Sequence, residues 1–134
     1  MSKNDNARDI SNYRIRMAKE DLDTAAELLE SGRYKGAVNR AYYAVFHSIR
    51  AILALDGVDF SKHSGVIAYF RQNYIKTEIF HNELSNVIQR AALMRTESDY
   101  SGFYIATEDE AREMINGAFL FYSKVVEFLR SKGQ

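Results

Sequence analysis

The stretch AVNRAYYAVFHSIRAILAL, Ala37 to Leu55, decides the fold class of this chain. On a helical wheel at about 100° per residue its apolar side chains cover most of the circumference, as in a helix buried inside a domain. The remaining arc is a narrow polar stripe made of Asn39, Arg40, Tyr43, His47 and Arg50. A solvated face is usually rich in flexible Lys and Glu, whereas these side chains hydrogen-bond in fixed directions or stack on rings. We interpret the stripe as a functional cleft or a dimer seam, with a plain, partly wetted helix face as the alternative.

The composition predicts one all-α domain. The chain has 134 residues, no proline and seven glycines, so a single core with few interruptions is expected over residues 1–134. The recurring 3.6-residue apolar pattern predicts an antiparallel up-and-down bundle of four to five helices. These helices are expected at roughly residues 10–31, 34–56, 62–75, 82–97 and 107–131.

Charge and cysteine content narrow the function classes. The chain has no cysteine, which removes disulfides, thiolate metal sites and cysteine nucleophiles and fits a reducing cytoplasm. Eighteen basic side chains balance eighteen acidic ones, so any contact with nucleic acid must be local. No apolar run reaches the ~18 residues of a membrane span, and the N-terminus lacks the apolar segment of a signal peptide. We therefore expect a cytoplasmic protein without membrane contact.

Local signals set the ends of the predicted helices. The first helix is expected to begin near Ile10 and to end at Gly32, a residue type that stops helices. Ser61 is a candidate N-cap for the third helix. The segment Ser98–Ala106 breaks the helical pattern and is predicted as a loop.

The last predicted helix opens with a capping box formed by Thr107 and Glu110. One apolar stripe of this helix consists of Ala111, Ile115, Ala118, Tyr122, Val125 and Leu129. A second stripe, at heptad spacing, consists of Met114, Phe121 and Phe128. Two apolar faces exceed what one bundle covers, and large exposed apolar patches are uncommon on monomers. We therefore predict a homodimer that buries the second face.

Four pieces of the chain together resemble the HEPN domain family, named for higher eukaryotes and prokaryotes and for nucleotide binding. They are AVNRAYYAVFHSIRAIL, SKHSGVIAYF with Lys62 and His63, RTESDY at Arg95–Tyr100, and FLFYSKVVEFL near the C-terminus. The resemblance implies an antiparallel helical bundle that usually dimerises. In the ribonuclease branch of that family, an Arg followed after four to six residues by a His forms a metal-independent RNA-cleaving site. Many prokaryotic members accompany a minimal nucleotidyltransferase, and the two resemble a toxin and antitoxin pair.

This sequence departs from the ribonuclease pattern, because four to six residues after Arg95 lead to Tyr100, Ser101 or Gly102. The motif present, Arg-x-x-x-Asp-Tyr, resembles that of a prokaryotic subgroup. Tyr has an ordinary pKa near ~10 and is a poor base at neutral pH, whereas Arg95 can clamp a phosphate and Asp99 can orient the guanidinium. Arg95 extends the edge of the apolar stripe of its helix, where a charge usually has a partner. Arg95, Asp99 and Tyr100 are therefore the candidate catalytic residues.

Histidines and arginines elsewhere supply the candidate ligand-binding residues. These are Asn39, Arg40, Tyr43, His47, Arg50 and His63. Arg40 and His47 have the family's spacing in the wrong helix, and His47 could approach Arg95 if the two helices are adjacent. His63 beside Lys62 is a candidate anion ligand, with a solvated histidine as the alternative reading.

Two further side-chain patterns are assigned no functional role. Tyr42 faces the apolar arc and is assigned to the core. The segment Glu78-Ile79-Phe80-His81 matches Glu-x-x-His of di-iron bundles, which need a second copy, so we read it as chance. No metal and no cofactor are predicted.

The resemblance leaves three functions open. The first is a protein of a prokaryotic toxin-antitoxin or nucleotide-linked stress module, which binds a nucleotide, RNA or a nucleotidyltransferase partner near Arg95. The second is a metal-independent ribonuclease with a non-standard base. The third is a non-catalytic structural dimer, so the sequence alone leaves enzyme activity undecided.

Overall fold

A computed structural model describes residues 3–100 and 105–133, with side chains for 6–97 and 105–133. The helices are α1 (Lys3–Glu30), α2 (Tyr34–Leu55), α3 (His63–Phe70), the π-helical segment η1 (Arg71–Ile75), α4 (Glu83–Tyr100) and α5 (Glu108–Ser131). All regular structure in the described part of the chain is helical, which confirms the predicted all-α class. None of the described helices is long and apolar enough to cross a membrane.

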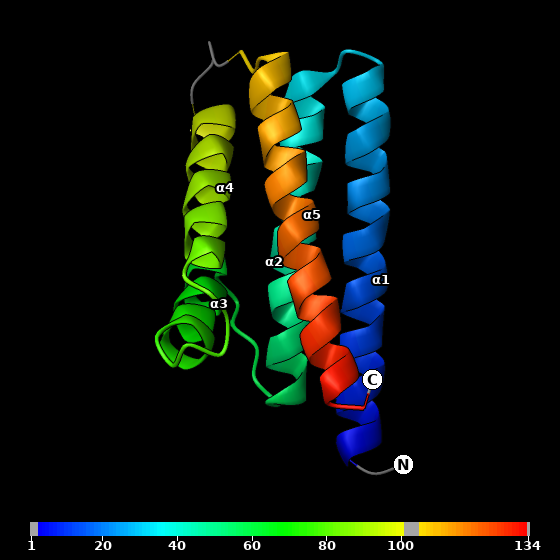
Figure 1. Ribbon diagram of the computed structural model, residues 1–134, viewed down its shortest axis with the longest axis vertical. Coiled ribbons are helices and arrows are strands. Elements are labelled where there is room, and N and C mark those ends of the chain that lie inside the picture. Colours follow the sequence, from blue (N-terminus) through cyan, green and yellow to red (C-terminus); the bar gives the residue numbers. More distant parts are fainter. Residues whose placement is uncertain (1–2, 101–104, 134) are drawn as a thin grey trace.

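The long helices alternate in direction along the chain (Figure 1). α1 and α2 form an antiparallel hairpin through a short turn in which Gly32 has φ +77°, a conformation that favours glycine. α2 and α5 run in the same direction and pack together, with α1 and α4 to either side (Figure 1). At the shared starting end of these two helices, the Tyr34 hydroxyl donates to Glu108 Oε1 at 3.0 Å.

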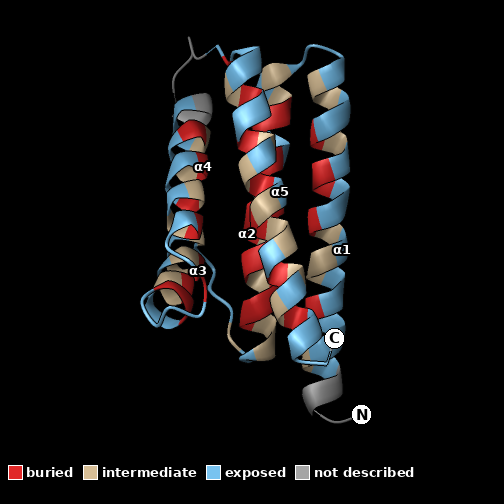
Figure 2. Ribbon diagram, in the orientation of Figure 1, coloured by how far each residue is buried: buried red, intermediate tan, exposed pale blue. Residues whose placement is uncertain are grey.

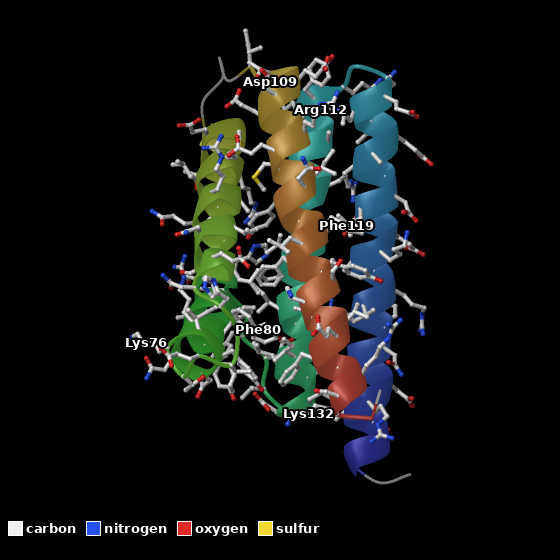
Figure 3. The ribbon with its side chains drawn as sticks, viewed as in Figure 1. Lys76, Phe80, Asp109, Arg112, Phe119 and Lys132 are labelled. Carbon is white, nitrogen blue, oxygen red and sulfur yellow. The ribbon has the colours of Figure 1, made fainter. Side chains whose placement is uncertain are left out.

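The core lies between the helices, since the ribbon segments coloured as buried in Figure 2 face the neighbouring helices. α2 contributes most to it, since Val38, Ile49 and Ile52 are each at most 1% exposed. An aromatic cluster closes the end near η1, where the ring centroid of Phe70 lies 5.6 Å from those of both Tyr74 and Phe121. Phe80 joins this cluster from the turn after η1 (Figure 3). The buried face of α2 predicted from its apolar arc is thus confirmed.

Three predicted helix ends are wrong. α1 begins at Lys3 rather than near Ile10, and α4 continues to Tyr100 through the start of the predicted Ser98–Ala106 loop. The N-cap of α3 is Lys62 rather than Ser61, and no side chain caps that helix. Each error lies where polar residues continue or begin a helix. Apolar periodicity does not predict a helix end at such positions. The remaining loop residues 101–104 lie outside the described residues.

α5 begins with the predicted capping box. The Thr107 side chain accepts from the Glu110 amide, and the Glu110 side chain accepts from the Thr107 amide. The second apolar face is already covered within the chain, since Met114 is 2% and Phe121 0% exposed. The prediction of a homodimer assumed that this face is not covered within one chain, and that assumption is wrong. The large apolar side chain that α5 leaves exposed is Phe119, at 59%.

Candidate functional site

Arg95 meets His63 and Tyr42 where three helices come together. Arg95 comes from α4, His63 is the first residue of α3, and Tyr42 lies in the first half of α2. Arg95 Nη1 lies 2.8 Å from His63 Nδ1 and 3.5 Å from Tyr42 Oη, and Tyr42 Oη lies 2.8 Å from the same His63 nitrogen. The partner expected for a charge at the edge of the α4 stripe is thus confirmed.

The protonation of His63 follows from these contacts. A guanidinium can only donate hydrogen bonds, so His63 Nδ1 is the acceptor and its ring carries the proton on Nε2. The Tyr42 hydroxyl lies within hydrogen-bond distance of the same nitrogen and accepts from Arg95 Nη1. Burial, and next the positive charges of Arg95 and Arg50, lower the pKa of His63. His63 is accordingly a neutral imidazole at neutral pH.

Aromatic rings hold the cluster in place. The Phe46 ring stacks on His63 at a centroid distance of 4.0 Å. The Arg95 guanidinium carbon lies 5.0 Å from the ring centroid of Tyr42 and 5.7 Å from that of Tyr43, within cation–π range. The cluster borders a cleft of about 250 Å³ lined by Tyr42, His63, Ser64, Ile67, Ala92, Arg95 and Thr96. A planar cation fixed by rings at a cleft wall suits the recognition of a phosphate or carboxylate.

A second polar cluster joins α1 and α2. Arg14 Nη1 lies 3.5 Å from His47 Nδ1, and His47 Nε2 lies 3.8 Å from Asp21 Oδ2. Asp21 also accepts from Arg40 at 3.3 Å. Burial, then the charges of Arg14 and Arg50, lower the pKa of His47 to about 4. Burial raises the pKa of Asp21, an effect that Arg40 opposes. His47 is therefore neutral at pH 7, and its approach to Asp21 is a dipolar contact rather than an ion pair.

The other stripe residues of α2 occupy different surroundings. Arg50 Nε lies 3.2 Å from Asp59 Oδ1, and Arg50 Nη2 donates to the Phe60 carbonyl at 3.2 Å. The Arg50 guanidinium also lies 4.9 Å from the ring centroid of Phe46, the ring that stacks on His63. Asn39 is exposed. The predicted stripe is thus divided between the Arg95 side and the α1 side.

Only part of the predicted site comes together. His63, for which a solvated histidine was the alternative interpretation, contacts Arg95. His47 instead contacts Arg14 of α1. Tyr42 has the buried ring that was predicted, at 4% exposed, yet its hydroxyl belongs to the site. A tyrosine on an apolar arc could have been flagged because its polar tip needs a partner when its ring is buried.

Two further sets of residues singled out in the sequence are not placed in this cluster by the described side chains. The side chains of Asp99 and Tyr100 lie outside the described residues. The Glu78–His81 segment is a turn in which Glu78 has φ +63°, so its ends are not on one helix face as a di-iron motif requires. Within the described residues, no group of three or more His, Asp or Glu side chains could hold a metal ion.

Comparison with known proteins identifies the family of this chain. The HEPN domain family model matches residues 11–129. A Thermotoga maritima relative named UPF0332 protein is 36% identical, covering 90% of this chain and 91% of its own length. A Methanocaldococcus jannaschii relative named "Putative toxin" is 33% identical, covering 87% of this chain and 86% of its own. The crystal structure of an archaeal HEPN homologue matches with a TM-score of 0.63 at 20% identity, over 87% of this chain and 95% of that one. The chain belongs to the HEPN family.

Proposed function

We propose that this protein is a toxin-like HEPN protein whose Arg95 cluster binds a phosphate-bearing ligand, RNA or a nucleotide. The observation that carries the proposal is the 2.8 Å contact between Arg95 Nη1 and His63 Nδ1 at a cleft wall. Arg95 can exchange this neutral acceptor for an anionic phosphate oxygen, which forms a stronger hydrogen bond with a guanidinium. The toxin names of the relatives support the same direction.

Aromatic side chains around Arg95 favour a ligand that carries bases. Tyr43 is half-buried and lies edge-on to His63 at a centroid distance of 6.3 Å. A ring at the edge of a phosphate site offers a base a stacking surface. Because the chain has a formal net charge of zero, we expect this binding to depend on the local site rather than on a general attraction to polyanions.

The partners follow from the family resemblance. A homodimer and a minimal nucleotidyltransferase partner in a prokaryotic cytoplasm would suit a toxin-antitoxin module. Light scattering of the purified protein tests the homodimer. A single monomer mass at micromolar concentration would refute the homodimer. A structural role for the cluster predicts that Arg95→Ala abolishes such a dimer without altering any ligand binding.

Fluorescence anisotropy of a labelled, mixed-sequence single-stranded RNA tests the binding proposal. We expect Arg95→Gln to weaken binding about tenfold or more, because a charge-assisted hydrogen bond is lost. Arg90→Gln is the matched control, since Arg90 is an exposed arginine of the same helix whose charge pairs with Glu113 at 3.1 Å. Equal affinities of the wild type and Arg95→Gln would refute the proposal. AMP as a competitor distinguishes a nucleotide site from an RNA site.

Metal-independent RNA cleavage is the second candidate, and the position of His63 favours it. His63 is neutral and therefore able to accept a proton, and Arg95 is a cation for the phosphate. His63 thus brings an imidazole to Arg95 from another helix, in a motif that lacks its own histidine. Cleavage of RNA in EDTA that is lost in His63→Gln and kept in His81→Gln would support catalysis, because the His81 side chain is 79% exposed. RNA binding without RNA cleavage by the wild-type protein would contradict catalysis and support binding alone.

A further inference from the structure

A second pocket lies between the N-terminal half of α1 and the C-terminal end of α2. It encloses about 510 Å³, a volume in the range of small-molecule sites. Its lining residues are Asn6, Ala7, Ile10, Arg14, Arg50, Ala54, Gly57, Val58 and Asp59. None of them lines the cleft at Arg95, so the two sites can be altered separately.

Two arginines form the polar wall of this pocket, and one of them has no carboxylate partner among the described residues. Arg14 donates to the neutral ring of His47, and no carboxylate of the described residues lies within ion-pair distance of its guanidinium. Arg50 is closer to neutralised, with Asp59 Oδ1 at 3.2 Å. Of the two, Arg14 is therefore the cation without a carboxylate partner among the described residues.

The charges of the wall leave one net positive charge. Arg14 and Arg50 contribute two positive charges, and Asp59 contributes one negative charge. Burial is the main cause that lowers the pKa of His47, and the charges of Arg14 and Arg50 lower it further. A single anionic group would balance this wall, which fits a carboxylate better than a phosphate monoester with its second negative charge.

The rest of the pocket is apolar. Ala7, Ile10, Ala54 and Val58 line it, and Ile10 is 52% exposed. A large aliphatic side chain left half open beside a cavity gains free energy when a ligand covers it, at about 25 cal/mol per Å² of apolar surface. The pocket therefore offers an apolar enclosure next to a forked cationic donor.

We infer that this pocket binds an organic monocarboxylate with a compact aliphatic or aromatic body. The carboxylate would accept hydrogen bonds from Arg14, with the positive charge of Arg50 beside it, and the body would lie against Ile10 and Val58. Arg14 and Arg50 belong to different helices, so the ligand would also link α1 to α2 at the end of the bundle far from the Gly32 turn.

Isothermal titration calorimetry of the full chain tests this inference. The probes are octanoate and 2-naphthoate at up to millimolar concentration, with the neutral 2-naphthalenemethanol and inorganic phosphate as comparison ligands. We expect at least one carboxylate to bind, and Arg14→Gln to weaken that binding about tenfold or more. Arg16→Gln is the matched control, because Arg16 is an exposed arginine of the same helix. Ile10→Asp is expected to abolish binding, and the exposure of Ile10 makes this change compatible with folding.

Several results would overturn the inference. They are no binding of either carboxylate to the wild type, equal binding of the neutral alcohol, tighter binding of phosphate, and unchanged binding in Arg14→Gln. Loss of binding in Arg95→Ala with full binding in Arg14→Gln would place the carboxylate in the other cleft. Retained carboxylate binding in Arg95→Ala, together with lost RNA binding, would show that the two sites are independent.

Discussion

His47 makes the stability of the protein depend on pH between 6.5 and 4. Its side chain is 13% exposed, and its pKa in the folded protein is about 4, against the ordinary 6.5. As the pH falls below 6.5, the unfolded chain takes up a proton at His47 and the folded protein does not. The folded state therefore loses stability through this window, and the loss is complete below about pH 4.

The size of the effect follows from the difference between the two pKa values. A difference of about 2.5 units corresponds to roughly 3 kcal/mol in full. Between pH 7 and pH 5 the loss is about 2 kcal/mol. We expect His47→Gln to remove this part of the pH dependence, because glutamine is neutral throughout and can still accept from Arg14. Urea unfolding at pH 7 and pH 5, followed by circular dichroism, measures it.

Other groups also titrate in this range. The lowered pKa of His63 acts in the same direction as that of His47, and the raised pKa of Asp21 acts in the opposite direction. Both are present in the wild type and in His47→Gln, so the difference between the two proteins isolates His47. His81→Gln, at a histidine with a 79% exposed side chain, should keep the wild-type pH dependence. Identical changes in unfolding free energy for the wild type and His47→Gln would refute this reasoning.

Three further predictions concern packing, capping and the site. Phe121→Ala should cost about 3–5 kcal/mol of unfolding free energy, because the ring is 0% exposed. Phe119→Ala on the same helix should change the unfolding free energy by about 0.5 kcal/mol or less. Similar urea midpoints for the two variants would contradict the assigned core. Thr107→Ala should cost about 1 kcal/mol through loss of the capping box, and an unaltered thermal midpoint would argue against that cap. Tyr42→Phe should cost about 1 kcal/mol through its hydroxyl contact with His63, and unchanged urea unfolding would show that this contact adds nothing.

Sequence periodicity predicted the helices where burial shapes the sequence. α2 and α5 have apolar stripes and clear ends, and their observed bounds lie close to the predicted ones. The start of α1 was missed because residues 3–9 carry no apolar stripe, and a helix can continue past its packing partners on its own hydrogen bonds. The last turn of α4 was missed for the same reason, because its sequence also lacks an apolar stripe. Phe121 and Phe128 of α5 were found, but only the placement of Phe70, Tyr74 and Phe80 shows which rings pack on them within the chain.

The site was harder to predict because its members are far apart in sequence. Arg95 became a candidate through the family resemblance of the RTESDY segment, and its place at the edge of an apolar stripe indicated that its charge has a partner. Its contact with His63 depends on how α3 and α4 lie against α2, which the periodicity of a single helix does not encode. Spacing therefore drew attention to His47, whose place on α2 matched the family's interval, while the imidazole that contacts Arg95 comes from the start of another helix.

The shared direction of α2 and α5 has an electrostatic consequence. Each helix has a macrodipole with a positive N-terminal end, and parallel packing brings two such ends together. α2 has no acidic residue in its first turn, whereas α5 has Glu108, Asp109 and Glu110 in its own. The hydrogen bond from Tyr34 to Glu108 ties the start of α2 to this acidic turn. One cluster of carboxylates thus compensates two helix dipoles, and the start of α2 depends on charges located some seventy residues further along the chain.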